Sequence, residues 1–250
     1  MKISPESAIV KLREADRLSE DGKNDEASAL LQELEQISSH HRDVATLRLK
    51  RAIVMTNAGK TSDAQELIST VDPDLLSEEY RLSFKFETGR IKAAQGETED
   101  AIMVLTQALR DADGMIVSGD LEFVRQGMIL LLGTLLCDSG KPTRAIPFFS
   151  QIHRGTHGWE RAWRSLGDCY FEMFDYKEAI KFYGEVVNAK EDISELERNI
   201  AIRNIGAAYC HLRDFRRAAQ YLELALVKFN DFPERKREIE EMMRVCSANL

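Results

Sequence analysis

The feature that most constrains the fold of this chain is a glycine or alanine followed by alanine twelve positions later, which occurs six times. Successive pairs begin 34 to 44 residues apart, and they are Ala15/Ala27, Ala52/Ala64, Gly89/Ala101, Gly133/Ala145, Gly167/Ala179 and Gly206/Ala218. A period of this length is typical of repeat proteins, in which each repeat is one small unit that packs against its neighbours. The spacing therefore predicts a single array of repeats.

Each repeat has the pattern of two helices joined by a turn. Seven residues after the first small residue, four repeats have a glycine and the last two have Phe174 and Arg213. Apolar residues after each alanine recur at helical spacing. Because small residues let two helix backbones approach closely, each repeat is predicted to be a helical hairpin. A single hairpin leaves apolar faces uncovered, so neighbouring hairpins must stack.

The fifth repeat resembles the tetratricopeptide repeat (TPR). It carries the Trp, Leu-Gly, Tyr, Ala and aromatic signature of that family at Trp163, Leu166, Gly167, Tyr170, Ala179 and Tyr183. The sixth repeat has most of the same pattern, whereas the first two are degenerate, with Ala15 and Ala52 in place of the glycine. The resemblance implies an all-α fold, a right-handed α-solenoid of six TPR-like helical hairpins plus a C-terminal capping helix.

We expect one solenoid over residues 1–250. Its repeats lie near 4–38, 45–76, 80–111, 121–155, 160–190 and 197–230, and the capping helix lies at 233–249, with an apolar stripe of Ile239, Met242, Met243 and Val245. The longest spacing holds about ten extra residues at 111–120, rich in glycine and aspartate. A loop is expected there, followed by a helix capped by Asp120. This insertion is either a plain surface loop or a hinge between two halves of three repeats.

Composition excludes several classes of protein. The net charge of −8 argues against nucleic-acid binding, which needs a surplus of Lys and Arg. The first residues do not resemble a secretion signal, and no apolar run is long enough to span a membrane. The four cysteines show neither zinc-type spacing nor a dense disulfide framework, so a cytoplasmic location is expected. Cys137, Cys169 and Cys210 lie on successive first helices; they either fill helix packing or come near one another.

No motif for catalysis is present. The chain has no phosphate-binding glycine loop and no nucleophile elbow. His153 and His157 have the spacing of two metal ligands on a helix, but glycines interrupt them, so an ordinary loop is expected. We therefore predict no enzyme activity, no catalytic residue, no metal and no cofactor.

The resemblance to TPR proteins implies that the first helices line a concave groove that binds a peptide or helix. Phasing the helices on the small residues selects as groove positions Leu49, Ile53, Phe86, Arg90, Leu130, Arg161, Arg164, Asp168, Phe171 and Arg203. The same phasing also selects Ile9, Leu12, Asp16, Thr46, Thr134, Cys137, Ile200, Ala207 and Cys210. The groove arginines either form bidentate hydrogen bonds with carboxylates of a partner or pair with acidic residues of their own helices.

The predicted function is a non-catalytic scaffold or adaptor that holds a segment of another protein in this groove. The alternative is a chaperone-like or regulatory sensor whose superhelix changes curvature when it binds a partner or small ligand. Relatives that grip the C-terminal carboxylate of heat-shock chaperones use a set of lysines, asparagines and arginine, of which only Asn204, with Arg203 beside it, has a counterpart here. An adaptor for chaperone tails is therefore not predicted.

Overall fold

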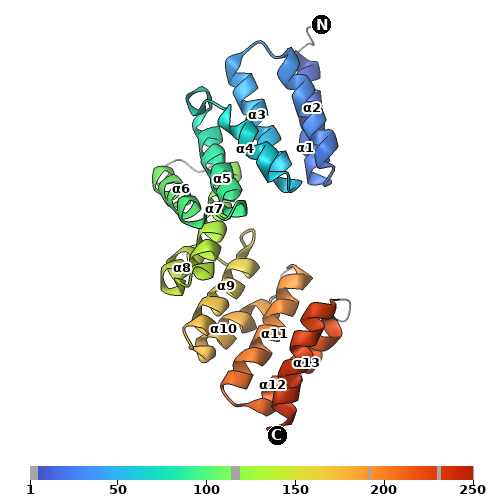
Figure 1. The fold of residues 1–250 in the computed structure, drawn as a ribbon, viewed down its shortest axis with the longest axis vertical. Helices are drawn as coiled ribbons and strands as arrows, with labels where there is room; N and C mark the ends of the chain where they lie inside the picture. The colour runs from blue at the N-terminus through green and yellow to red at the C-terminus, as the bar shows by residue number, and fades with distance from the viewer. Residues whose placement is uncertain (1–4, 114–118, 191–192, 230–231, 250) are drawn as a thin grey trace. The chain divides into compact units, whose positions relative to one another are not determined.

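The computed structural model describes residues 5–113, 119–190, 193–229 and 232–249, and within these ranges it contains helices and turns but no strand (Figure 1). Six helical hairpins precede a single last helix. They are α1 (Pro5–Glu20) with α2 (Asn24–Ile37), α3 (His41–Asn57) with α4 (Thr61–Ser69), α5 (Glu78–Ala94) with α6 (Thr98–Ala112), α7 (Gly119–Asp138) with α8 (Pro142–Phe149), α9 (Trp159–Glu172) with α10 (Tyr176–Val187), and α11 (Glu195–His211) with α12 (Phe215–Lys228), followed by α13 (Pro233–Ser247). A short 3-10 helix, η1 (Pro73–Leu75), precedes α5. The predicted all-helical fold of six hairpins and a last helix is confirmed.

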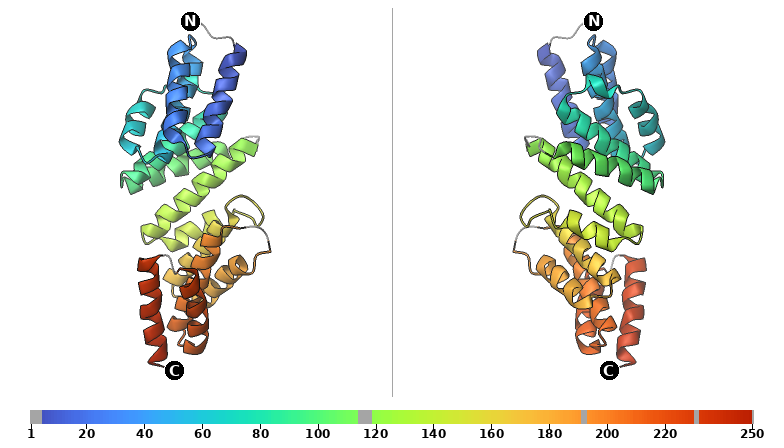
Figure 2. Two further views of the ribbon diagram at one scale, coloured as in Figure 1. Left: turned by 90° about the vertical axis from the view of Figure 1, so that its right-hand side faces the viewer. Right: turned by 90° about the vertical axis from the view of Figure 1, so that its left-hand side faces the viewer.

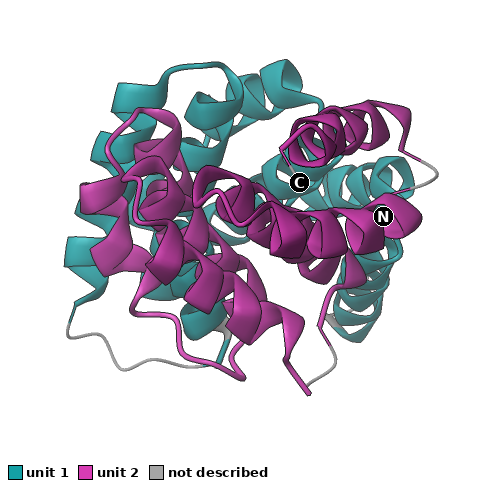
Figure 3. Ribbon diagram, turned by 90° about the horizontal axis from the view of Figure 1, so that it is seen from below, with its two compact units in different colours: residues 1–128 teal, residues 129–250 magenta. Residues whose placement is uncertain are grey.

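The chain divides into two compact units, Met1–Met128 and Ile129–Leu250, coloured separately in Figure 3. The division falls inside α7 and not in the segment 111–120. Residues 114–118 of that segment and the side chain of Asp120 lie outside the described residues. The predicted hinge and helix cap therefore stay predictions.

Each hairpin turn contains one residue with a positive φ. In the first four hairpins this residue is the expected glycine, with φ between 68° and 80°. Phe174 and Arg213 take the same left-handed conformation, with φ of 63° and 60°. Side chains rarely adopt this conformation because Cβ crowds the backbone. The last two turns therefore keep the geometry of the glycine turns at some energetic cost.

The small residue of each first helix lies against a side chain sixteen residues further on, in the second helix. A Cβ atom added to the glycine would lie under 3.0 Å from that side chain in four hairpins: Gly89 with Leu105, Gly133 with Phe149, Gly167 with Tyr183, and Gly206 with Leu222. Close approach of the two helices explains why these positions are glycine. In the second unit, each helix from α9 to α12 packs against the next helix of the chain, and Figure 2 draws this part in yellow to red.

In the first unit, α3 packs against α2, α4 and α5, so most of its surface is covered. Leu49 and Ala52 of α3 and Ile91 of α5 are fully buried in one core cluster. The α5 helix also buries Glu87, whose side chain is only 1% exposed. Burial raises the pKa of the Glu87 carboxyl, and the neighbouring guanidinium of Arg90 acts against that shift.

In the second unit, α13 covers the last hairpin. Ile239 and Cys246 are fully buried against α12 and α11, and Met242 and Met243 are partly buried there. The predicted stripe was wrong in one member, because Val245 is 53% exposed. Cys246 takes its place, since it lies seven residues after Ile239, two helical turns along the same face.

Candidate functional site

The α9 helix presents a row of charged residues on one face. Arg161, Arg164, Asp168 and Glu172 follow one another at intervals of three or four residues, which places them along one side of the helix. The opposite side buries apolar residues such as Ala162 and Leu166 in the hairpin. The polar row is therefore free to face the space between first helices.

This row lines a pocket of about 780 Å³ within the second unit. The end of α7, α9, α11 and α13 form its walls, together with Phe149 and Tyr183 of α8 and α10. Its apolar lining comes from Phe171, Ile200, Met242 and Val245. The volume is within the range of about 300–1,000 Å³ found for ligand sites in proteins.

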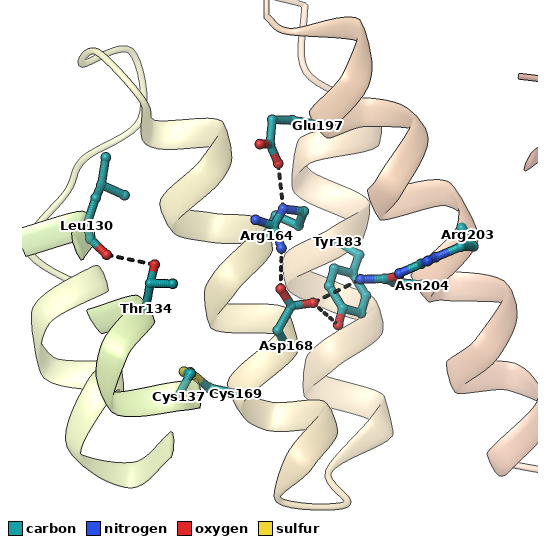
Figure 4. Close-up of polar contacts among 10 residues, drawn as sticks. All are labelled: Leu130, Thr134, Cys137, Arg164, Asp168, Cys169, Tyr183, Glu197, Arg203 and Asn204. Carbon is teal, nitrogen blue, oxygen red and sulfur yellow. Dashed lines mark hydrogen bonds and ion pairs between the residues drawn. The ribbon is translucent and has the colours of Figure 1, made fainter. Parts of the chain in front are cut away.

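Asp168 is the centre of a hydrogen-bond network in the pocket (Figure 4). One carboxylate oxygen accepts from the guanidinium of Arg164. The other accepts from the hydroxyl group of Tyr183 at 2.7 Å and from the side-chain amide of Asn204 at 2.9 Å. Three helices, α9, α10 and α11, are thereby joined through a single carboxylate.

The network continues on both sides of Asp168. Arg164 also donates through Nε to Glu197 of α11 at 2.5 Å. Arg203 donates through Nε and Nη2 to the amide oxygen of Asn204, at 3.1 and 2.9 Å, and through Nη1 to Glu238 of α13 at 3.2 Å. Arg164 and Arg203 therefore both have partners within the second unit.

Burial is the strongest influence on the ionisable groups of the network. It raises the pKa of the Asp168 carboxyl, and Arg164 and the hydrogen bond from Tyr183 act against that shift. Burial and the charge of Asp168 raise the pKa of the Tyr183 hydroxyl well above its ordinary range. The tyrosine therefore stays protonated at neutral pH and acts as a hydrogen-bond donor to Asp168.

Charges without an internal partner lie at the two ends of the row. Among the described side chains, none forms an ion pair or hydrogen bond with Arg161, which is exposed at the pocket. Glu172 and Asp138 line the other end, and Glu241 also lines the pocket. Burial raises the pKa of Glu172, and the nearby carboxylates of Asp168 and Asp138 add to the shift. The potential at this end is therefore negative, whereas the Arg161 end carries a positive charge.

The structure brings together nine of the groove positions selected from the sequence, which all line this one pocket: Thr134, Cys137, Arg161, Arg164, Asp168, Phe171, Ile200, Arg203 and Ala207. Phe171 also packs edge-on against Tyr176 and His211, with ring centroids 5.2 Å apart in both pairs. Leu130 lies outside the pocket, beside Gly158 in the segment before α9.

Eight positions were selected in the first unit, and four of them, Leu49, Ile53, Phe86 and Arg90, lie outside the pocket that Ile9, Leu12 and Thr46 line. Leu49 is fully buried, and Ile53 packs against the same core, so Leu49 offers no surface to a partner. Arg90 is bound to Glu87 and to Asn57 and lies 5.8 Å from the ring centroid of Phe86. That more apolar pocket, of about 690 Å³, is also lined by Tyr80.

Sequence reasoning missed Tyr183 and Glu238 as pocket residues and Glu197 as the partner of Arg164. Tyr183 lies on a second helix, where the repeat pattern assigns only a packing role, and Glu238 lies on α13. The signal for Tyr183 was its position sixteen residues after Gly167, which places its ring against α9 and its hydroxyl group beside Asp168.

His153 and His157 lie in the non-helical segment between α8 and α9. The described residues contain no group of three or more His, Cys, Asp and Glu side chains that could hold a metal ion. Within the same residues, no helix combines the length and apolar character needed to cross a membrane.

Comparison with known proteins identifies the repeat in the centre of this site. Residues 160–193, which contain most of α9 and all of α10, match the family model described as tetratricopeptide repeat. No curated protein matches the chain by sequence.

Solved structures share the fold over most of the chain. The apo form of RapI has a TM-score of 0.71 at 17% identity, covering 96% of this chain and 71% of RapI. PilF of Pseudomonas aeruginosa has a TM-score of 0.70 at 16% identity, covering 94% of this chain and 97% of PilF. YrrB, described as a TPR protein with an unusual peptide-binding site, has a TM-score of 0.54 at 17% identity over 81% of this chain and 89% of its own. Residues 160–193 of this chain therefore match a tetratricopeptide repeat, and the chain shares the helical fold of these solved structures.

Proposed function

We propose that this chain is a non-catalytic scaffold whose second unit binds a segment of another protein in the pocket between α7, α9, α11 and α13. The observation that carries the proposal is the arrangement of charge in this pocket. Arg161 at one end and Glu172 with Asp138 at the other have no internal partner among the described residues, and apolar side chains lie in the same lining.

A pre-formed lining favours binding. Arg164 and Glu197 are only 17% and 15% exposed, and their hydrogen bonds fix the side chains that face the pocket. A bound segment then loses less free energy to ordering of the protein side chains. That YrrB, a protein of this fold, has a peptide-binding site is consistent with such a role.

The charges restrict the partner. Arg161 and Glu172 are eleven residues apart on α9, which corresponds to about 16 Å along a helix. A matching extended segment carries an acidic residue near Arg161 and a Lys or Arg about five residues away. Apolar side chains between them fit against Phe171, Ile200 and Met242. Opposite charges at both ends set the direction of the bound segment.

The test is a charge reversal in the pocket, Arg161→Glu with Glu172→Lys, and affinity purification of the full chain from its native cell. The matched control is Arg216→Glu with Glu223→Lys, which makes the same changes at exposed positions of α12 outside the pocket. We expect the pocket variant to recover at least tenfold less partner and the control to match the unaltered chain. Equal recovery by the pocket variant, with thermal unfolding unchanged, contradicts the proposed site.

A further inference from the structure

All four cysteines of the chain are free and lie in two pairs. The Sγ atoms of Cys137 on α7 and Cys169 on α9 are 2.7 Å apart, and Figure 4 shows the two side chains meeting between these helices. The Sγ atoms of Cys210 on α11 and Cys246 on α13 are 2.9 Å apart. In each pair one cysteine is half-buried and its partner is fully buried.

The half-buried cysteine of each pair occupies the same place in the repeat. Cys137 and Cys210 each lie four residues after the small residue of their first helix, Gly133 and Gly206. Cys169 lies two residues after Gly167, on the next first helix. In the stack of α7 on α9, the residue four positions after the small residue of the first helix therefore lies beside the residue two positions after the small residue of the next.

The stack of α9 on α11, between the two pairs, has no cysteine at the corresponding positions. At the corresponding positions of α9 and α11 the chain has Phe171 and Ala208, so no third pair can form there.

We propose that Cys137–Cys169 and Cys210–Cys246 are two dithiol sites that form disulfides on reaction with a small-molecule disulfide such as oxidised glutathione. A disulfide has an S–S distance of about 2.05 Å, so each pair closes with a movement of less than about 1 Å. One bond then links α7 to α9 and the other links α11 to α13, across two of the helix contacts that form the pocket walls. The inference does not depend on the partner proposed above.

The reaction proceeds by thiol–disulfide exchange. At the first site, the thiolate of Cys137, which reaches the pocket, attacks one sulfur of glutathione disulfide and releases one glutathione. Cys169 loses its proton and displaces the second glutathione from the mixed disulfide. Overall, two S–H bonds are replaced by one S–S bond, and the two protons and two electrons reduce glutathione disulfide to two glutathione molecules.

The surroundings of the thiols make this exchange slow. The hydrogen bond with Cys137, and burial after it, raise the pKa of Cys169 above its ordinary range. Burial, together with the Cys246 hydrogen bond, raises the pKa of Cys210 to about 12. Cys169 and Cys210 are therefore mostly protonated at neutral pH, so closure of the two disulfides takes minutes to hours.

The experiment uses the full chain, first reduced and then incubated natively with oxidised glutathione, followed by alkylation and peptide mapping without reduction. We expect two linked peptides, 137–169 and 210–246, and a rise in melting temperature of about 5 °C or more that dithiothreitol reverses. Cys169→Ser should remove only the first link, and Cys246→Ser only the second. If a variant fails to fold, the linked peptides of the unaltered chain still test the proposal.

Four outcomes overturn the proposal in whole or in part. If all four thiols can still be alkylated after the incubation, no disulfide has formed and the whole proposal is wrong. Links between the pairs, such as 137–246, contradict the proposed pairing. Stable glutathione adducts on Cys137 without a link to Cys169 exclude the first site, and the absence of one of the two linked peptides excludes the corresponding site.

Discussion

Gly167 of α9 lies so close to Tyr183 of α10 that a Cβ atom at position 167 would be 2.6 Å from Cδ1 of the tyrosine ring. The hydroxyl group of the same tyrosine donates a hydrogen bond to Asp168 at 2.7 Å. The residue that lets the two helices approach is thus next in sequence to the residue at the centre of the pocket network. Packing of the repeat and construction of the site are therefore linked.

Gly167→Ala should destabilise the protein by about 1–3 kcal/mol, because the new methyl group overlaps the Tyr183 ring. The control is Gly184→Ala on α10, where an added Cβ has no neighbour within 4 Å. That change should stabilise the helix by about 0.5–1 kcal/mol. Urea denaturation measures both, and equal effects of the two substitutions would be inconsistent with the packing described.

Arg213→Gly should stabilise the protein by up to about 1 kcal/mol, because Arg213 has a φ of 60° in the turn before α12. Arg216→Gly, three residues further on and inside α12, should cost about 1 kcal/mol. Both side chains are exposed, so the comparison isolates the backbone conformation. Thermal unfolding of the two variants checks the opposite signs, and a loss of stability in Arg213→Gly would refute this account of the turn.

Tyr183→Phe should cost about 1–2 kcal/mol, because it removes one donor to the Asp168 carboxylate while keeping the ring that packs on Gly167. In a chain that already carries Asp168→Ala, the same substitution should cost clearly less. The double-mutant cycle, measured by urea denaturation, gives the coupling between the two groups. A coupling of zero would mean that this hydrogen bond does not stabilise the network.

Glu87→Gln should gain stability relative to the unaltered chain as the pH rises from 4 toward neutral. Burial raises the pKa of Glu87 in the folded state, so the unfolded chain releases this proton at a lower pH than the folded one. Stability is therefore highest when the group is protonated and falls between the unfolded and the folded pKa. Glu66→Gln, at an exposed position of α4, is the control. A difference in unfolding free energy that does not change with pH would contradict the shifted pKa.

Much of the fold could be predicted because each pair of small residues twelve positions apart marks a place where two helices pack closely. The position three residues before the small residue shows where such reasoning stops. It faces the neighbouring first helix in both units, and there Leu49 joins a core whereas Arg164 joins a polar network. Helical phase gives the direction of a side chain along its own helix, but contacts from the next hairpin decide whether that side chain is buried, paired or free.

For the same reason the pairing partners in the site could not be read from the sequence. Arg164 pairs with Glu197 on α11 and Arg203 pairs with Glu238 on α13, 33 and 35 residues away in the sequence. Their spacing depends on the lengths of the turns between hairpins, which vary along this chain. Cys246 was likewise not expected beside Cys210, since it lies on the last helix, where the repeat pattern ends.

Site-specific photo-crosslinking in the native cell tests the pocket most directly. A photoreactive phenylalanine analogue replaces Val245, which lines the pocket and is 53% exposed, or Val227, which is 74% exposed on α12 outside it. We predict a covalent adduct with one partner protein from position 245, lost when Arg161→Glu and Glu172→Lys are added, and no such adduct from position 227. No adduct at 245, or the same adduct at both positions, would contradict the pocket as the binding site.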